Sequence, residues 1–295
     1  MLEFLHLPIA RQLVAQGDLI GSEILPLPAE APGTFGALSM PLLLQHPRVS
    51  FVSYPWEWPP ALWLAAADLT LDLCDKLLRE GWTLKDATPL NVLFQGVRPV
   101  FVDVLSIERA DLTHTLWLPY GQFVRTFLLP MLAHLRLGWP LHATLMRRDG
   151  YEPEEIYAAL SLRERMRRPA LSAVTLPTMM KRRAASDSED AAPPRPTSKD
   201  PELTRHVLRK TFQGLRRQMR RTVPPARTST WSDYAATATH YSEPDHDAKR
   251  SFVSEVLAQC RPQRLLDIGC NTGVYSRLAA RAEPPSSPST PTSRP

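Results

Sequence analysis

Proline is the residue that most constrains how this chain of 295 residues can fold. The sequence holds 30 prolines, about twice the number expected from an average usage of ~5%. They cluster near the two ends of the chain and between residues 193 and 225. Because proline fixes its φ angle and lacks an amide hydrogen, it interrupts helices and central strands. The proline-rich segments are therefore poor candidates for regular structure.

Composition and cysteine usage point to a globular protein of the cytoplasm. Hydrophobic residues make up 43% of the chain, which is enough for a real core and for two domains of ordinary size. No apolar run approaches the ~20 residues of a membrane span, and an acid stands in the N-terminus Met1–Phe4 where a signal peptide carries positive charge. Three cysteines fit neither a zinc site nor a secreted disulfide framework. We expect no membrane span and a cytoplasmic location.

Basic residues are concentrated in one part of the chain. Residues 161–227 hold 17 of the 35 lysines and arginines but only 6 of the 30 acids. Clustered basic side chains can bind nucleic acid by releasing counterions from phosphates. Phe212 is the one aromatic residue in this block that could stack on a base. We therefore favour a solvated arginine-rich helix and linker over a nucleic-acid partner.

Hydrophobic spacing predicts a helix that begins near Pro60 and ends at Gly81. Apolar residues recur there at intervals of three and four, and glycine is a common residue just after a helix. Further expected elements are a β-hairpin (92–94 and 100–102), short helices within 117–148, a charged helix (151–167), a linker (170–201), a basic helix (201–221) and a helix at 247–260.

Three polar residues stand around the predicted hairpin. Asp86 and Asn91 precede its first strand, and Asp103 follows its second strand. Oxygen ligands of this kind suit magnesium, which prefers one or two carboxylates together with phosphate oxygens. The layout resembles the catalytic and metal-binding segments of protein kinases and aminoglycoside phosphotransferases. That resemblance implies Asp86 as the base, Asn91 and Asp103 as magnesium ligands, and ATP as the nucleotide.

Two other interpretations of this constellation remain open. The segment could be a kinase-like scaffold that no longer transfers phosphate, which we favour over an active phosphotransferase. Alternatively, the polar residues could do no more than cap the hairpin.

A glycine loop lies near the end of the sequence. Residues 264–268 are expected to form a buried strand, Gly269 allows a sharp turn, and Gly273 allows a helix to begin close to the strand. The N-terminus of that helix would offer free N–H groups to a ligand. The segment Asp-Ile-Gly-Cys-Asn-Thr-Gly resembles the first motif of class I S-adenosylmethionine-dependent methyltransferases. The resemblance implies a cofactor site for S-adenosylmethionine that contains Asp267, Gly269, Cys270, Asn271 and Gly273.

Several segments together resemble a bacterial family of class I methyltransferases related to nodulation proteins. Residues 54–58, 83–91, 231–234 and 267–273 match its layout, in which a kinase-like segment precedes the cofactor loop. The resemblance implies methyl transfer from S-adenosylmethionine to an acceptor that it does not identify. It also implies an α+β kinase-like domain followed by the first β-α unit of an α/β Rossmann-like methyltransferase domain.

The expected organisation has six parts. They are an N-terminal extension (1–34), a kinase-like domain (35–170), a flexible linker (171–200), a helical bridge (201–250), the start of the methyltransferase domain (251–281) and a disordered tail (282–295). A doubly wound sheet needs several strands beyond the first, and the proline- and serine-rich tail cannot supply them. We therefore expect a methyltransferase domain that is truncated and impaired in this chain. A non-enzymatic interaction fragment is the remaining alternative.

Overall fold

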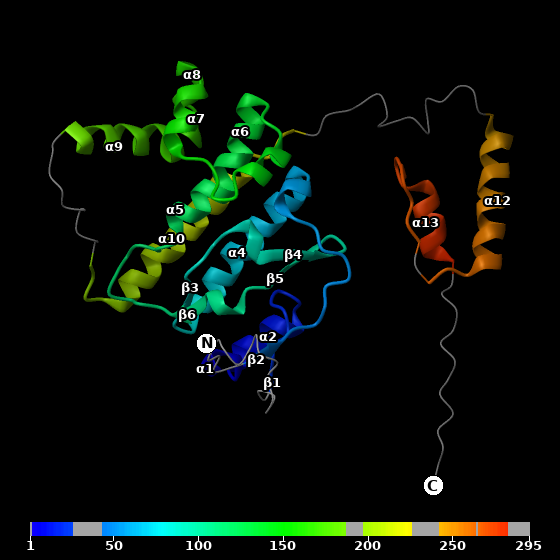
Figure 1. The fold of residues 1–295 in the computed structure, drawn as a ribbon, viewed down its shortest axis with the longest axis horizontal. Helices are drawn as coiled ribbons and strands as arrows, with labels where there is room; N and C mark the ends of the chain where they lie inside the picture. The colour runs from blue at the N-terminus through cyan, green and yellow to red at the C-terminus, as the bar shows by residue number, and fades with distance from the viewer. Residues whose placement is uncertain (1, 26–42, 187–196, 226–241, 264, 283–295) are drawn as a thin grey trace, which may run out of the picture. The chain divides into compact units, whose positions relative to one another are not determined.

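The computed structural model describes residues 2–25, 43–186, 197–225, 242–263 and 265–282 (Figure 1). The chain divides into two compact units, which are residues 1–224 (unit 1) and 225–295 (unit 2). The expected segments 231–234 and 283–295 lie outside the described residues, as does Arg264. None of the described helices is both long and apolar enough to cross a membrane.

Unit 1 combines helices with three antiparallel strand pairs. Its described helices are α1 (Leu2–Leu5), α2 (Pro8–Ala15), α4 (Pro60–Arg79), α5 (Tyr120–Phe123), α6 (Leu129–Leu137), α7 (Pro153–Ala159), α8 (Leu162–Arg165), α9 (Leu176–Ser186) and α10 (Pro201–Arg220). The strands are β1 (Glu23–Leu25), β2 (Leu43–Gln45), β3 (Trp82–Leu84), β4 (Val92–Gln95), β5 (Arg98–Phe101) and β6 (Ile107–Arg109), paired β1–β2, β3–β6 and β4–β5.

Shorter turns of helix connect these elements. The 3₁₀ turns are η1 (Pro55–Glu57), η2 (Pro89–Asn91), η3 (Val104–Ser106) and η5 (Leu141–Met146), and the π turns are η4 (Val124–Leu128) and η6 (Leu171–Thr175). Unit 2 contains α12 (Glu243–Cys260) and α13 (Val274–Arg281).

Helix α4 is the centre of unit 1. Prolines occupy its first positions, where no amide hydrogen is needed, and Gly81 follows its end with φ +75°. Trp63, Leu71 and Leu77 are completely buried because β3, β5 and α10 all pack against the helix. The predicted helix and the predicted hairpin (β4–β5) are thus confirmed.

The segment expected as an N-terminal extension belongs to this core. Phe4 and Leu13 are completely buried, and the Phe4 ring lies 5.3 Å from the Trp82 ring. The chain then runs parallel to β5, where the Ile20 amide donates to the Phe101 carbonyl at 2.9 Å. Residues 2–20 are therefore part of the domain, and the boundary expected at residue 34 was wrong.

Two other expected segments also differ from the structure. The single helix expected over 151–167 is divided into α7 and α8, and Ser161 caps α8 by accepting from the Glu164 amide. Residues 171–186, expected as linker, form η6 and α9. Ala173 and Val174 are buried there, and η6 packs against α7. The apolar residues of this short stretch, rather than its single proline, Pro177, decide its structure.

Helix α10 packs along α4 and belongs to unit 1, so the helical bridge expected over 201–250 is divided at Pro224. Leu208, Phe212, Leu215 and Met219 are buried on its inner side.

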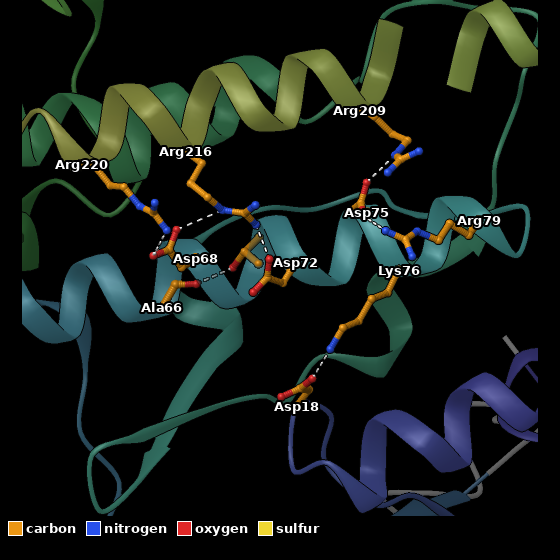
Figure 2. A network of polar contacts seen from close by, with 11 residues as sticks. Asp18, Ala66, Asp68, Asp72, Asp75, Lys76, Arg79, Arg209, Arg216 and Arg220 are labelled. Atoms are coloured by element: carbon orange, nitrogen blue, oxygen red, sulfur yellow. Dashed lines mark hydrogen bonds and ion pairs between the residues drawn. The ribbon is translucent and has the colours of Figure 1, made fainter. Parts of the chain in front are cut away.

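Figure 2 shows that the arginines of α10 point toward the acids of α4. Arg209 pairs with Asp75 (2.8 Å), Arg216 pairs with Asp72 and with Asp68 (3.2 Å), and Arg220 lies 3.8 Å from Asp68. Residue numbers rise on one helix as they fall on the other, so the two helices are antiparallel.

We name this row of ion pairs the α4–α10 seam. Partial burial raises the pKa of Asp75, but hydrogen bonds from Arg209 and Arg79 outweigh it and hold that pKa below its ordinary value. A carboxyl with a lowered pKa stabilises the fold above its unfolded pKa, and this contribution is lost as the pH falls through the folded pKa. For Asp72, burial has the larger effect, and it raises the pKa against the attraction of Arg216. Acid therefore weakens the contribution of Asp75 to the seam, whereas the raised pKa of Asp72 acts in the opposite direction.

Replacing Arg216 with alanine is expected to lower the stability of unit 1. The side chain contacts both Asp68 and Asp72 and is about one quarter exposed, so we expect a loss of about 1 kcal/mol. Urea unfolding would measure it, and the loss should shrink at high salt because ions screen such pairs. Arg217→Ala is the matched control, since Arg217 is exposed on the same helix. An equal loss in both variants would show that the seam adds nothing beyond helix propensity.

Candidate functional site

The structure brings two of the three polar residues of the hairpin, Asn91 and Asp103, together at one serine, Ser106. Asn91 lies in η2 before β4, and Asp103 lies directly before η3 after β5. The hydroxyl of Ser106 donates to Asp103 Oδ2 and accepts from Asn91 Nδ2 at 3.3 Å. The Ser106 carbonyl accepts from the Lys85 amide at 2.8 Å, which fixes the loop that carries Asp86. Ser106 is completely buried, so this connection is part of the core.

Asp86 is held by a different residue. The amide of Gln122 in α5 donates to Asp86 Oδ1 at 3.3 Å, and its Oε1 accepts from the Ala87 amide at 2.6 Å. Gln122 therefore binds both the side chain of Asp86 and the backbone amide of the next residue, Ala87. Sequence reasoning missed Gln122 because it lies 36 residues from Asp86 and no spacing rule connects the two. Ser106 was also missed, although aspartates such as Asp103 commonly begin a turn by accepting from the backbone amide two residues later.

The oxygen atoms around Ser106 are mostly engaged in hydrogen bonds. Asp103 Oδ1 accepts from the Leu105 amide at 3.1 Å, and Asp103 Oδ2 accepts from Ser106. Asn91 donates through Nδ2, so its Oδ1 is the atom suited to a cation. In the described part of the chain, no cluster of three or more histidine, cysteine, aspartate or glutamate side chains is arranged to hold a metal. A magnesium ion here would need Asp103 to exchange a hydrogen bond for the metal.

The second predicted site lies in unit 2, between α12 and α13. Gly269, Asn271 and Gly273 have φ values of +75°, +50° and +74°. Only glycine adopts such angles without strain, and asparagine tolerates them better than most other residues. Gly273 is the N-cap of α13, and its amide donates to the Cys270 carbonyl at 2.7 Å. The turn at Gly269 and the start of the helix after Gly273 agree with the prediction from the glycine spacing, whereas the left-handed Asn271 was not predicted.

Side chains of α13 hold this loop in place. Ser276 Oγ donates to Asp267 Oδ2 at 2.6 Å, and Arg277 Nη1 donates to the Thr272 carbonyl at 2.7 Å. Asp267 is half-buried, whereas Gly269, Cys270 and Asn271 are exposed. Ser276 was not among the predicted residues, and its position in the first turn of the helix is the signal that could have indicated it. The first turn of α13 therefore fixes the carboxylate of Asp267 and the Thr272 carbonyl.

The strand predicted before this loop is not formed. Residues 265–268 have no strand conformation, and Leu265, Leu266 and Ile268 are 50%, 83% and 87% exposed. A strand exists only when a neighbouring strand accepts its hydrogen bonds, and the described part of unit 2 consists of α12, α13 and their connections. Of the expected β-α unit, the structure therefore contains the helix, α13, without the strand before it.

Comparison with known proteins gives one informative similarity. The chain is 30% identical over 279 residues to the protein named "Nodulation protein NoeA" of Rhizobium meliloti (strain 1021), and the alignment covers 92% of this chain and 56% of that protein. No family model matches the chain, and no solved structure matches it. The chain thus spans about half the length of the curated relative that it matches. The similarity confirms the expected relation to a nodulation protein.

Proposed function

We propose that the loop from Asp267 to Gly273 is the S-adenosylmethionine-binding loop of a methyltransferase, and that this chain supplies that loop to the reaction. One observation carries the proposal, namely three left-handed residues at Gly269, Asn271 and Gly273 directly before a helix N-terminus. Such a backbone lets a ligand approach closely and offers it free N–H groups. The half-buried Asp267, held by Ser276, supports the same geometry.

The chemistry of such a site requires little from the side chains of the loop. In methyl transfer an acceptor attacks the methyl group of the cofactor, and the protein contributes mainly orientation and proximity. Gly269 and Gly273 would allow the backbone to contact the cofactor, and Asp267 would hold the loop in shape. The acceptor is part of this proposal only as a nucleophile.

Photochemical labelling tests the proposal on this chain. Irradiation with methyl-labelled S-adenosylmethionine should label the peptide that contains Cys270 and Asn271, and Asp267→Ala should reduce the label several-fold because the loop loses its contact with Ser276. Asp247→Ala is the control, since Asp247 is an exposed acid of α12. Label that spreads over unit 1, or label unchanged in Asp267→Ala, would contradict the proposed site.

A second candidate function is magnesium-dependent phosphoryl transfer in unit 1, or nucleotide binding by a kinase-like domain without transfer. The observation that favours it is the meeting of Asn91 and Asp103 at Ser106, with the Asp86 loop attached to the same serine. These are the residues that would hold the metal and position a hydroxyl group.

This candidate predicts calorimetric binding of ATP that requires magnesium. Asp103→Ala should abolish the binding, and Asp149→Ala should leave it unchanged because Asp149 is an exposed acid elsewhere in unit 1. Binding that survives without magnesium, or that survives in Asp103→Ala, would remove the metal role of this cluster.

A further inference from the structure

The basic residues of α10 include three neighbouring pairs. The pairs are Arg209 with Lys210, Arg216 with Arg217, and Arg220 with Arg221. The first member of each pair contacts acids of α4 in the α4–α10 seam (Figure 2). Successive residues of a helix point about 100° apart around its axis. The second members of the three pairs therefore lie together on a different side of α10.

We name these second members the outer basic row, which consists of Lys210, Arg217 and Arg221. All three residues are exposed, and none of them forms an ion pair with another described residue. The row extends over about 16 Å along the helix axis. The helix adds no negative charge to this side, because its one acid, Glu202, lies in the first turn and pairs with Arg205.

The stability of α10 explains the outer basic row only in part. The helix dipole favours Arg217 and Arg221 near the C-terminal end, but it does not favour Lys210 near the middle of the helix. Like charges four residues apart also repel each other, as Arg217 and Arg221 do. A helix side that is merely solvated usually mixes both signs of charge. A row of one sign therefore points to a partner with negative charge.

The phosphate backbone of double-stranded nucleic acid is the partner that fits this row best. It carries one negative charge per about 1.7 Å of helix axis, and cations that contact it release bound counterions. Single strands are usually held by aromatic side chains that stack on the bases. Phe212, the aromatic residue of α10, is 2% exposed and packs on Trp117. The structure thus removes base stacking on α10 but leaves its phosphate contacts available.

An anionic membrane surface fits the row less well. Helices that lie on a membrane bury an apolar face among the lipids, in addition to any attraction between charges. The inner side of α10, which includes Leu208 and Leu215, is instead buried within unit 1. Charge alone would then have to hold the helix on the lipid.

We propose that the outer basic row of α10 is a contact surface for the phosphate backbone of double-stranded nucleic acid. Lys210, Arg217 and Arg221 each contact a phosphate, and such contacts carry no sequence preference of their own. The seam fixes the helix on α4 and so holds the row in place. The charge balance of residues 161–227 could not reveal this surface, because it does not separate the paired arginines of the seam from the unpaired row.

Fluorescence anisotropy with a short labelled DNA duplex of mixed sequence tests the proposal on the full chain. We expect binding at low salt, and its logarithm should fall against the logarithm of the salt concentration with a slope of about −2.7, from about −0.9 for each of three phosphate contacts. The triple variant Lys210→Gln, Arg217→Gln and Arg221→Gln should weaken the binding at least tenfold and remove most of this slope. Glutamine is a good helix former, so α10 should persist.

The matched control is the triple variant Arg11→Gln, Arg48→Gln and Arg148→Gln, which removes the same net charge from exposed arginines outside α10. It should leave the affinity and the slope unchanged, and an equal loss in the two variants would show that net charge alone causes the binding. An RNA duplex in a separate sample distinguishes the two sources of such a backbone, and binding of either duplex supports the proposal.

Three further results would overturn the proposal. They are the absence of duplex binding at low salt, tighter binding of a single strand than of the duplex, and binding to phosphatidylserine vesicles without binding to a duplex. The last of these would show that the outer basic row contacts a membrane surface instead.

Discussion

Replacing Gly150 with alanine is expected to unfold unit 1 at room temperature or to destabilise it by more than about 4 kcal/mol. Gly150 has φ +84°, where any other residue is strained by about 1–2 kcal/mol. The larger cost comes from space, because an added Cβ would overlap the Arg125 carbonyl and would lie 2.9 Å from the Thr126 nitrogen. Both neighbours are backbone atoms of a buried helical turn, so they cannot rotate away.

The connection between Gly150 and this turn explains why neither side can give way. The Tyr151 amide donates to the same Arg125 carbonyl at 3.1 Å, so moving the chain apart would also break this hydrogen bond. Thermal or urea unfolding would measure the loss. Gly138→Ala is the matched control: its φ is +70°, but an added Cβ meets nothing within 4 Å. We expect Gly138→Ala to cost about 1 kcal/mol, and an equal loss in the two variants would contradict the close approach at Gly150.

Trp63→Ala is expected to cost about 3–5 kcal/mol of stability, because the change removes a completely buried ring from the centre of unit 1. The ring packs at 6.0 Å from the Trp58 ring, and its Nε1 donates to the Phe127 carbonyl at 3.1 Å. This hydrogen bond joins α4 to η4 over 64 residues of sequence. A typical domain has only 5–15 kcal/mol of stability in total, so the variant should unfold at a much lower urea concentration.

The phenylalanine variant separates the two contributions of Trp63. Trp63→Phe keeps most of the apolar volume but loses the donor, so it should cost clearly less than Trp63→Ala. A loss of 1 kcal/mol or less in Trp63→Ala, measured by urea unfolding at neutral pH, would contradict the central position of this ring in the core, because that value is typical of an exposed side chain.

Local patterns in the sequence predicted the elements whose structure depends on local contacts. The helix that begins at Pro60, the β4–β5 hairpin and the basic helix α10 follow from periodicity, turn glycines and proline positions. The left-handed residues Gly269 and Gly273 follow from the glycine spacing of the loop. In each of these cases the deciding interactions lie within a few residues of one another.

Contacts between distant segments could not be predicted in the same way. Arg216 pairs with acids almost 150 residues away, so α10 was expected to lie in solvent. The sequence does contain a signal of this contact, because Asp68, Asp72 and Asp75 form one stripe on α4, and Arg209, Arg216 and Arg220 form a matching stripe on α10. The strand expected before Gly269 is not formed, since its residues lack a neighbouring strand in the described part of unit 2.

A nuclear magnetic resonance titration of the ¹⁵N-labelled chain would test the proposed binding of S-adenosylmethionine by the loop from Asp267 to Gly273. We predict that the cofactor shifts the backbone amides of Gly269, Asn271 and Gly273. The affinity should be weaker than micromolar, because helices alone flank the loop in the described part of unit 2. ATP with magnesium, added to a separate sample, should leave these amides unmoved. If the cofactor leaves all three amides in place up to its solubility limit, or shifts only the signals of Asn91 and Asp103, the claim is contradicted.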